Sequence, residues 1–263
     1  MDRPWLALIL MPLWSMLFQN VGSFLDMMAK DLISPAYPGG VCCILMGFLA
    51  LWIHKLIFRP EFKGSLNGKN LGKGILFLLP AFAFVIMNLM GLNNSTGHTL
   101  ASVIAAILAG SVPGVVEEVA FRGLSGSNFM RLWHDGKKIR LAAILTGIVF
   151  GGVHIANLIA GAALSATLVQ VAYAIGLGIM FAAVYFRTGS LWPSIIMHCL
   201  IDISYHLQAT SGILSKAAST RTIILLGTFA VLFTAYGLFL LRDKKVDEIN
   251  AVWKDIWGQE YVE

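Results

Sequence analysis

Residues 222–241 read TIILLGTFAVLFTAYGLFLL, a run of twenty residues without a charged side chain. A helix of about twenty apolar residues is long enough to cross the hydrocarbon core of a bilayer. Similar runs recur along the chain, which is 57% hydrophobic and only 13% charged. Soluble domains carry roughly 25% charged residues. The sequence therefore predicts an all-α integral membrane protein.

Hydropathy predicts about eight transmembrane helices in one polytopic bundle. The expected spans are residues 4–25, 39–58, 73–92, 100–128, 141–163, 167–186, 190–209 and 222–241. We divide the chain into an N-terminal part with three helices (1–99), a core with the next four (100–209) and a C-terminal part with the last helix and a tail (210–263). The tail carries apolar residues at helical spacing, which predicts an amphipathic helix on the membrane surface, with a free solvated helix as the alternative. These residues are Val246, Ile249, Val252, Trp253 and Ile256.

Lysine and arginine are distributed unevenly between the predicted loops. One side of the membrane would carry Lys55, Arg59, Lys63, Lys69, Lys73, Arg131, Lys137, Lys138, Arg140, Arg187, Arg242, Lys244 and Lys245. The other side would carry only Lys30, Lys216 and Arg221. Because cytoplasmic loops are enriched in basic residues, both termini are expected in the cytoplasm. This bias also accounts for the net charge of +5. No nucleic-acid-binding motif accompanies it, so the bilayer is the expected partner and nucleic acid is not.

The fourth predicted span contains two adjacent glutamates and an arginine. An ionisable side chain in the bilayer core costs about 2.5–3.5 kcal/mol on insertion scales, so such residues are candidates for function. Glu118 and Arg122 are four residues apart and share one helix face, which predicts an ion pair. Glu117 points about 100° away and finds no partner on its own helix. A carboxylate placed in this way is suited to act as a general base.

The fifth and seventh spans carry histidines. Phe150 lies one helical turn before His154, and their side chains can pack together. His198 and Asp202 share a face of the seventh span, and His206 continues the same stripe. A histidine oriented by a carboxylate is common around reactive sites. Each histidine taken singly has a structural alternative, either a packing residue or a polar clamp between helices.

The three groups of ionisable residues lie at similar depths. Glu117 and His154 are each fourteen residues from the basic residue at the cytoplasmic end of their span, or about 21 Å along the helix. His198 is eleven residues from its own basic anchor, or about 16 Å. We therefore expect the three spans to form one site. The sixth span has only Gln170 and Tyr173 as polar residues, besides Gly176 and Gly178, and is expected to be a packing helix.

These motifs, in this order, resemble the family of CAAX proteases and bacteriocin-processing enzymes, also called the CPBP or Abi family of intramembrane proteases. The family pattern is Glu-Glu-x-x-x-Arg, then Phe-x-x-x-His, then His-x-x-x-Asn or Asp. The matching residues are Glu117, Glu118, Arg122, Phe150, His154, His198 and Asp202. The resemblance covers about residues 100–205 and implies a helical membrane endopeptidase.

The resemblance also implies a role for each residue. Glu117 would activate a water for attack on a peptide carbonyl, helped by His154. His198 and Asp202 would stabilise the oxyanion, while Glu118 and Arg122 would hold the site together.

Asp202 leaves two mechanisms open. An asparagine donates an N–H at this position, whereas an aspartate donates only when it is protonated. An ionised Asp202 would suit a metal, and zinc held by Glu117, His154, His198 and Asp202 is the alternative cofactor. The His-Glu-x-x-His motif of common zinc proteases is absent. We favour the glutamate mechanism without metal.

The expected substrates are peptides or membrane proteins. They include prenylated-like C-termini, leader peptides of bacteriocins or pheromones, and other membrane proteins. In a bacterial cytoplasmic membrane, peptide maturation or immunity to a bacteriocin is the expected role. One alternative is a non-proteolytic binding or immunity protein on the same scaffold. Another is a proton-coupled transporter, since buried Glu and His also form proton relays; the motifs are not repeated in the other half of the chain, which argues against it.

Overall fold

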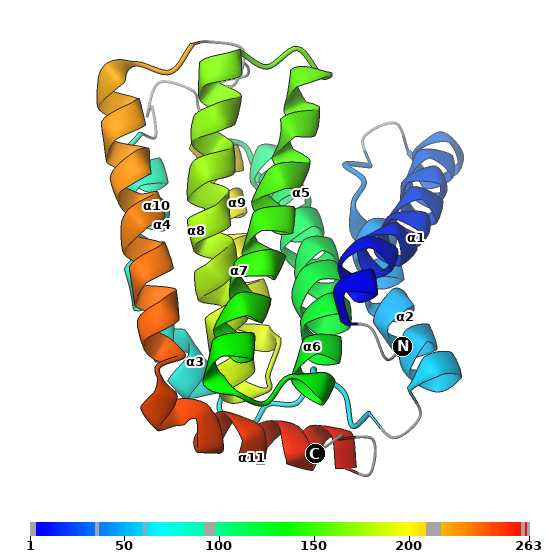
Figure 1. Cartoon of the computed structure of the whole chain (residues 1–263). Helices are drawn as coiled ribbons and strands as arrows, with labels where there is room; N and C mark the ends of the chain where they lie inside the picture. Colours follow the sequence, from blue (N-terminus) through cyan, green and yellow to red (C-terminus); the bar gives the residue numbers. More distant parts are fainter. Residues whose placement is uncertain are drawn as a thin grey trace.

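The computed structural model describes residues 4–34, 37–59, 62–91, 98–208, 217–258 and 261. Every secondary-structure element in these ranges is helical (Figure 1), so the predicted all-α class is confirmed. The elements are α1 (Pro4–Leu32), α2 (Val41–Phe58), α3 (Leu71–Phe77), η1 (Leu79–Ala81), α4 (Phe82–Met90), α5 (Leu100–Glu118), the π-helix η2 (Val119–Gly126), α6 (Ser127–Leu132), α7 (Gly136–Gly152), η3 (Val153–Leu158), α8 (Leu164–Thr188), α9 (Trp192–Gln208), α10 (Thr220–Leu240), η5 (Asp243–Lys245) and α11 (Val246–Trp257).

In the described part of the chain, five helices are long and apolar enough to cross a membrane. They are Trp5–Leu32, Leu100–Leu132, Gly136–Leu158, Leu164–Thr188 and Thr220–Leu240. The pair α3 and η1–α4 is bent by 50° and would add a sixth span if it crosses as one unit. The predicted spans at 39–58 and 190–209 correspond to α2 and α9, which are shorter helices. The length and composition of the described helices therefore do not confirm the predicted number of eight transmembrane helices.

The bundle is built from helices that pack pairwise. α7 and α10 both pack on α8, and α5 packs on α9, while α1 pairs with α2 at the side of the bundle (Figure 1). A Cβ at Gly114 of α5 would lie 2.8 Å from the backbone nitrogen of Cys199 in α9. A Cβ at Gly178 of α8 would lie 2.9 Å from Cα of Gly147 in α7. Glycines at these crossings let the backbones approach closely, which confirms the packing role expected of Gly178.

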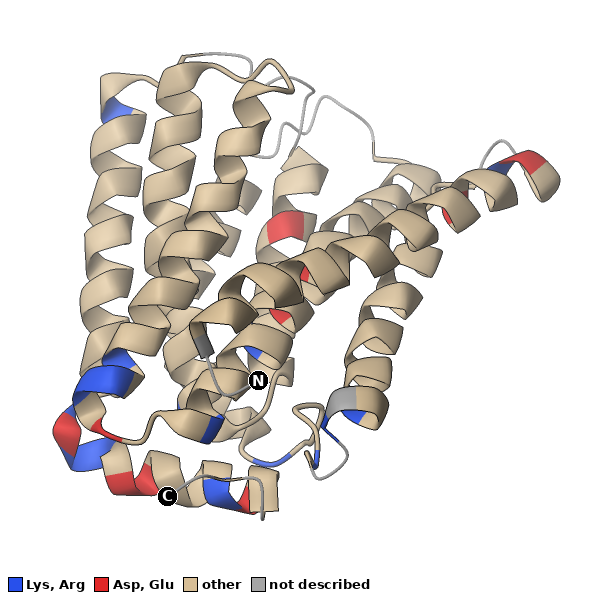
Figure 2. Ribbon diagram, turned by 45° about the vertical axis from the view of Figure 1, so that its right-hand side comes forward, with Lys and Arg blue, Asp and Glu red and all other residues tan. Residues whose placement is uncertain are grey.

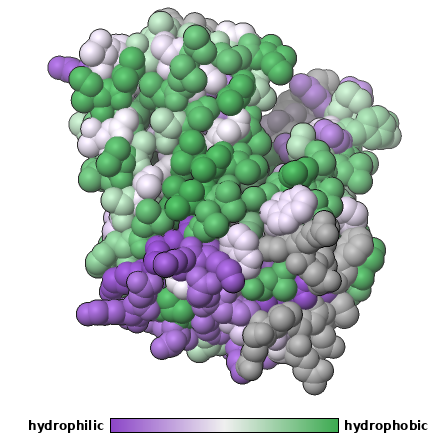
Figure 3. All heavy atoms as spheres, viewed as in Figure 1, coloured by the Kyte–Doolittle hydropathy of each residue, from purple (hydrophilic) through white to green (hydrophobic). Residues whose placement is uncertain are grey.

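The outer surface of the bundle is largely hydrophobic, as Figure 3 shows for one face. Large apolar side chains are exposed on the outside of α1 and α10, among them Leu17 (57%) and Val231 (67%). Below this apolar belt, on the same face, hydrophilic residues gather at the end of the bundle where α11 lies. An apolar belt bordered by charge is the surface that a bilayer covers. The protein is an integral membrane protein.

Most lysines and arginines lie at the α11 end of the bundle (Figure 2). At the opposite end, the described residues include only two basic side chains, Lys30 at the end of α1 and Arg221 at the start of α10. Lys216, which was assigned to this side from the sequence, lies outside the described residues. The asymmetry between the two ends is of the kind expected between the two sides of a membrane.

The C-terminal tail forms α11, which lies across one end of the bundle (Figure 1). Its apolar face is covered by the protein: Ile249, Trp253 and Trp257 are at most 1% exposed. Trp253 Nε1 donates to the Phe186 carbonyl at 2.9 Å, and Trp257 Nε1 donates to the Ser127 carbonyl at 3.1 Å. The prediction that this face lies on the membrane surface is wrong, because it packs against α6 and α8.

Candidate active site

A fully buried ion pair lies where α5 passes into η2. Arg122 Nη1 donates to Glu118 Oε1 at 2.8 Å, and both side chains are 0% exposed. Arg122 Nη2 donates to the carbonyl of Gly178 in α8 at 3.1 Å. The guanidinium carbon also lies 4.4 Å from the ring centroid of Phe150 in α7. The expected pair is therefore present, and it ties α5 to α7 and α8.

The helix that carries this pair is not regular. The sequence predicted one span over 100–128, whereas the structure changes from α-helix to π-helix directly after Glu118. A π-helical segment widens the turn and is frequent at functional sites. Here it lies within the buried part of the bundle, where every residue of η2 is buried. The change of winding begins at the glutamate pair.

His198 of α9 joins the ion pair to the cavity. Its Nδ1 lies 2.9 Å from Glu118 Oε1. Since a carboxylate paired with arginine only accepts hydrogen bonds, Nδ1 carries the proton. Its Nε2 then faces Glu117 Oε2 at 3.9 Å and Asp202 Oδ2 at 3.5 Å. Glu118 thus fixes the His198 ring through Nδ1, and Nε2 faces the carboxylates of Glu117 and Asp202.

The adjacent glutamates occupy different environments. The side chain of Glu118 is 0% exposed, whereas that of Glu117 is 30% exposed. Glu117 lines the cavity, as expected from the 100° turn per residue of a helix. Glu118 therefore lies in the protein interior, and Glu117 is accessible from the cavity.

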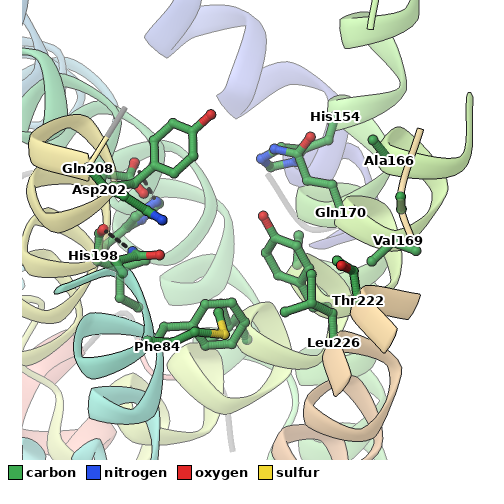
Figure 4. Close-up of a pocket in the computed structure, with 18 of the residues that line it drawn as sticks. Phe84, His154, Ala166, Val169, Gln170, His198, Asp202, Gln208, Thr222 and Leu226 are labelled. Atoms are coloured by element: carbon green, nitrogen blue, oxygen red, sulfur yellow. Dashed lines mark hydrogen bonds and ion pairs between the residues drawn. The ribbon is translucent and has the colours of Figure 1, made fainter. Parts of the chain in front are cut away.

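His154 reaches the same cavity from another wall. α7 ends at Gly152, and the chain continues as the 3-10 helix η3, so His154 does not lie on the regular helix predicted to residue 163. Its Nδ1 lies 3.0 Å from the Phe150 carbonyl, which can only accept, so Nε2 is left as a proton acceptor. In Figure 4, His154 faces His198 and Asp202 from the opposite side of the cavity.

The cavity has a volume of about 660 Å³, within the range of roughly 300–1,000 Å³ typical of binding pockets. α4, α5, α7, η3, α8, α9 and the start of α10 contribute to its lining. Its polar lining includes Asn88, Glu117, His154, Gln170, Tyr173, His198, Asp202, Tyr205, His206, Gln208, Ser219 and Thr222. All three histidines singled out in the sequence therefore line one cavity, and so do Glu117 and Asp202.

The sixth predicted span contributes more to the cavity than the sequence indicated. Gln170 and Tyr173 of α8 line it, so this helix lines the cavity in addition to the packing that was predicted for it. Asn157 Nδ2 donates to Gln170 Oε1 at 2.8 Å, which leaves the N–H groups of Gln170 available. A polar residue within an apolar span was the available signal, and it is the same signal that identified the histidines.

The residues do not fit the zinc alternative. Within the described ranges, no group of three or more His, Cys, Asp and Glu side chains is arranged to hold a metal ion. A site made by Glu117, His154, His198 and Asp202 would need His154 beside the other three. His154 instead faces His198 and Asp202 across the cavity (Figure 4).

Comparison with protein-family models matches residues 99–204 to the family described as type II CAAX prenyl endopeptidase Rce1-like. The matched segment begins at the N-cap of α5 and ends within α9, and it contains every residue of the three motifs. This confirms the resemblance that the motifs indicated. No curated protein and no solved structure matches the chain.

Proposed function

Because residues 99–204 match the model of the Rce1-like family of CAAX prenyl endopeptidases, we propose that the protein hydrolyses a peptide bond inside the membrane with a water activated by Glu117. One observation carries the proposal: Glu117, His198 and Asp202 converge at one wall of a cavity in an apolar bundle. The buried Glu118–Arg122 pair holds this wall in place.

In the proposed reaction, Glu117 takes a proton from a water lying against the substrate carbonyl carbon. The water oxygen forms a bond to that carbon, and the carbonyl π electrons move onto the oxygen. Collapse of the tetrahedral intermediate breaks the carbon–nitrogen bond, and the proton passes to the leaving nitrogen. The products are one carboxylic acid and one amine. General base catalysis of this kind contributes about 10²–10⁴-fold to rate.

The other groups of the cavity have complementary roles in this proposal. His198, doubly protonated, donates from Nε2 to the oxyanion while Glu118 accepts from Nδ1. Asp202, when protonated, supplies a second donor at the same position. His154, whose Nε2 is free to accept a proton, assists in orienting the water. Preorganised donors are worth the most where bulk water is excluded.

The proposal includes the place of the protein in the cell. We assign it to a bacterial cytoplasmic membrane with eight spans and both termini inside, α2 and α9 completing the set as short spans. The collection of basic residues at the α11 end supports this orientation (Figure 2). We take residues 100–209 as the catalytic core, and a peptide or membrane protein as the substrate, in peptide maturation or bacteriocin immunity.

The direct test is Glu117→Gln, which keeps the size of the side chain and removes the base. We expect peptide cleavage by the purified protein to fall about 10²–10⁴-fold, with thermal unfolding in detergent unchanged. Met87→Leu, on the apolar wall of the cavity, is the matched control and should remain active. Full cleavage by Glu117→Gln would falsify the assignment. Bacteriocin protection that survives in this variant would favour a binding or immunity role.

Metal content tests the type of mechanism separately. We expect metal analysis of the active protein to find no stoichiometric zinc, and a chelator to leave cleavage unchanged. Stoichiometric zinc together with chelator-sensitive cleavage would replace the glutamate mechanism by a zinc mechanism.

A further inference from the structure

Asn88 is a buried polar residue to which the proposed reaction assigns no role. It is the one polar side chain of α4, which reads FAFVIMNLM, and it lies outside the segment 99–204 that matches the family model. Asn88 is 8% exposed and lines the cavity together with Phe84 and Met87 of the same helix. An amide within an apolar helix costs free energy unless its polar atoms are hydrogen-bonded. The partners of Asn88 therefore indicate what it does.

Two contacts with α9 fix the orientation of the Asn88 amide. Asn88 Nδ2 lies 3.0 Å from the Ile201 carbonyl oxygen and 3.0 Å from Ser204 Oγ. The carbonyl can only accept, and Ser204 Oγ already donates its hydrogen to that carbonyl at 2.7 Å. Both contacts therefore require a donor, which is the amide nitrogen and not the amide oxygen. The two hydrogens of Nδ2 are used on α9, and Oδ1 occupies the other side of the amide.

Oδ1 of Asn88 is left as an acceptor. An amide oxygen accepts up to two hydrogen bonds, and none of the described residues donates one to it. Nor is it one of the polar atoms of the described residues that are fully buried without a partner. Because Asn88 lines the cavity, a molecule bound in the cavity can donate a hydrogen bond to Oδ1.

The segment of α9 that carries the reacting groups also positions this acceptor. The carbonyl that holds Asn88 belongs to the peptide unit between Ile201 and Asp202, and Asp202 lines the same cavity. Asp202 Oδ2 in turn lies 3.5 Å from His198 Nε2. Asn88 is therefore tied to the turn of α9 that follows His198, and a donor bound by Oδ1 belongs to the part of the ligand next to the reacting groups.

A peptide bound in this cavity needs such an acceptor. A backbone N–H that is removed from water requires a new hydrogen-bond partner. Gln170 offers N–H groups, because its oxygen accepts from Asn157, and N–H groups suit the carbonyls of a ligand. Asn88 offers the complementary oxygen, which suits an N–H. A peptide backbone carries both kinds of group.

We propose that Asn88 Oδ1 accepts a hydrogen bond from a backbone N–H of the substrate, close to the bond that is cleaved. Ser204 and the Ile201 carbonyl hold the amide in the orientation that presents this oxygen. The favoured ligand is a peptide with a free N–H at that position, and proline or an N-methylated residue is rejected there. Asn88 is thus a specificity-determining residue on a helix outside the matched segment. The assignment of a peptide as the ligand rests on the proposed endopeptidase function.

The contact can be tested by pairing a variant with a change of one atom in the ligand. The probe is a fluorescent octapeptide with a farnesylated cysteine fourth from its C-terminus, following the name of the matched family. Each backbone N–H outside the scissile bond is replaced in turn by an ester oxygen. Binding is measured in detergent in the Glu117→Gln background, with and without Asn88→Leu. We expect one ester to raise Kd about tenfold when Asn88 is present, the upper range for a neutral hydrogen bond, and to have almost no effect in Asn88→Leu.

Ester effects that are equal in the two proteins, or the absence of any ester effect, would overturn the proposal and leave Oδ1 as a site for water. Ser204→Ala tests the same contact if Asn88→Leu does not fold. It removes one of the two bonds that orient the amide, and should reduce the tenfold effect to about threefold. An undiminished effect in Ser204→Ala would contradict the inferred orientation. Met87→Leu, on the same helix, is the matched control and should keep the full ester effect.

Cleavage kinetics separate this contact from the proposed function. In the protein that retains Glu117, Asn88→Leu should raise KM about tenfold with kcat nearly unchanged, as expected for lost ground-state binding. If the parent protein cleaves the probe but no ester effect depends on Asn88, the contact is wrong and the function stands. If the parent protein does not cleave the probe while the binding pattern holds, the function is wrong and the contact stands.

Discussion

The two walls of the cavity are built differently. On the α5–α9 wall, Glu118 bonds both Arg122 and His198 within 3 Å, and the two residues of the ion pair are fully buried. On the opposite wall, formed by η3 and α8, His154 has one hydrogen bond, to the Phe150 carbonyl at the end of α7. Gln170 is held there by one bond, from Asn157. One wall is linked through a charged network, and the other is held by single neutral contacts.

This difference indicates that the two walls have different roles. Burying charges is costly, and a buried pair is rarely the most stable arrangement for a protein core. What the network provides is a fixed position for His198, and fixed donors are what a transition state requires. The wall with single contacts can adjust its side chains to the bound chain at small cost. We therefore expect changes on the first wall to affect folding and kcat, and changes at Gln170 on the second wall to affect substrate binding.

The largest effect is expected from breaking the network at Glu118. Glu118→Ala leaves Arg122 as a buried charge without a counterion, which costs about 3–5 kcal/mol of unfolding free energy. Thermal unfolding in detergent measures the loss. The double variant Glu118→Leu/Arg122→Met is the control, and should recover much of the stability but no activity, since His198 loses its acceptor. If Glu118→Ala were as stable as the parent protein, the stabilising role of the Glu118–Arg122 ion pair would be contradicted.

Substitutions of Asp202 distinguish a role as an oxyanion donor from a role as a metal ligand or base. We expect Asp202→Asn to keep cleavage within about tenfold of the parent rate, because the amide donates an N–H. Asp202→Ala should lower kcat about 10²-fold, as removal of an oxyanion donor does elsewhere. Steady-state kinetics on the two variants give the comparison. Equal damage by Asn and Ala would show that the ionised carboxylate is required.

On the second wall, Gln170→Leu removes a donor and keeps the volume. We expect KM to rise about tenfold with little change in kcat, the signature of lost ground-state binding. Asn157→Ala should have a smaller effect, about threefold, because it only frees the amide of Gln170 and a neutral hydrogen bond contributes about 0.5–1.5 kcal/mol. A fall in kcat at unchanged KM would place Gln170 with the reacting groups instead.

The smallest effect is expected outside the cavity, at Glu248 of α11. Hydrogen bonds from Lys73, Lys245 and Arg187 lower the pKa of Glu248 to about 2, from 4.5. Its contribution to stability is therefore complete above pH 4.5 and is lost as the pH falls towards 2. Glu248→Gln should cost about 0.5–1 kcal/mol near neutral pH, the scale of partly exposed ion pairs, and should flatten the stability profile between pH 4.5 and 2. An unchanged profile would mean that the ion pairs of Glu248 do not contribute to holding α11.

The sequence located most of the first wall and little of the second. Glu117, Glu118 and Arg122 follow one another on one segment, so helical geometry alone predicted which carboxylate pairs with the arginine. Gln170 and Asn157 are thirteen residues apart on different elements, and no helical period relates them. Their contact depends on how η3 turns back against α8, which is a property of packing.

For α11 too, the sequence pattern did not predict which surface covers the apolar face. An apolar stripe predicts that a face will be covered, but it does not distinguish a lipid surface from a protein surface. Trp253 and Trp257 are covered by the ends of the bundle because their indole N–H groups find backbone carbonyls there.

By itself, the sequence determined the membrane class, the helical architecture and the motif residues, because hydrophobic length and helical period are local properties of the chain. Only the tertiary structure decided that α11 closes one end of the bundle and that Gln170 faces the cavity. It also decided that His154 stands across the cavity from His198. These relations depend on close approach between helices, at crossings such as Gly114 against Cys199, and no local period encodes which surfaces will meet.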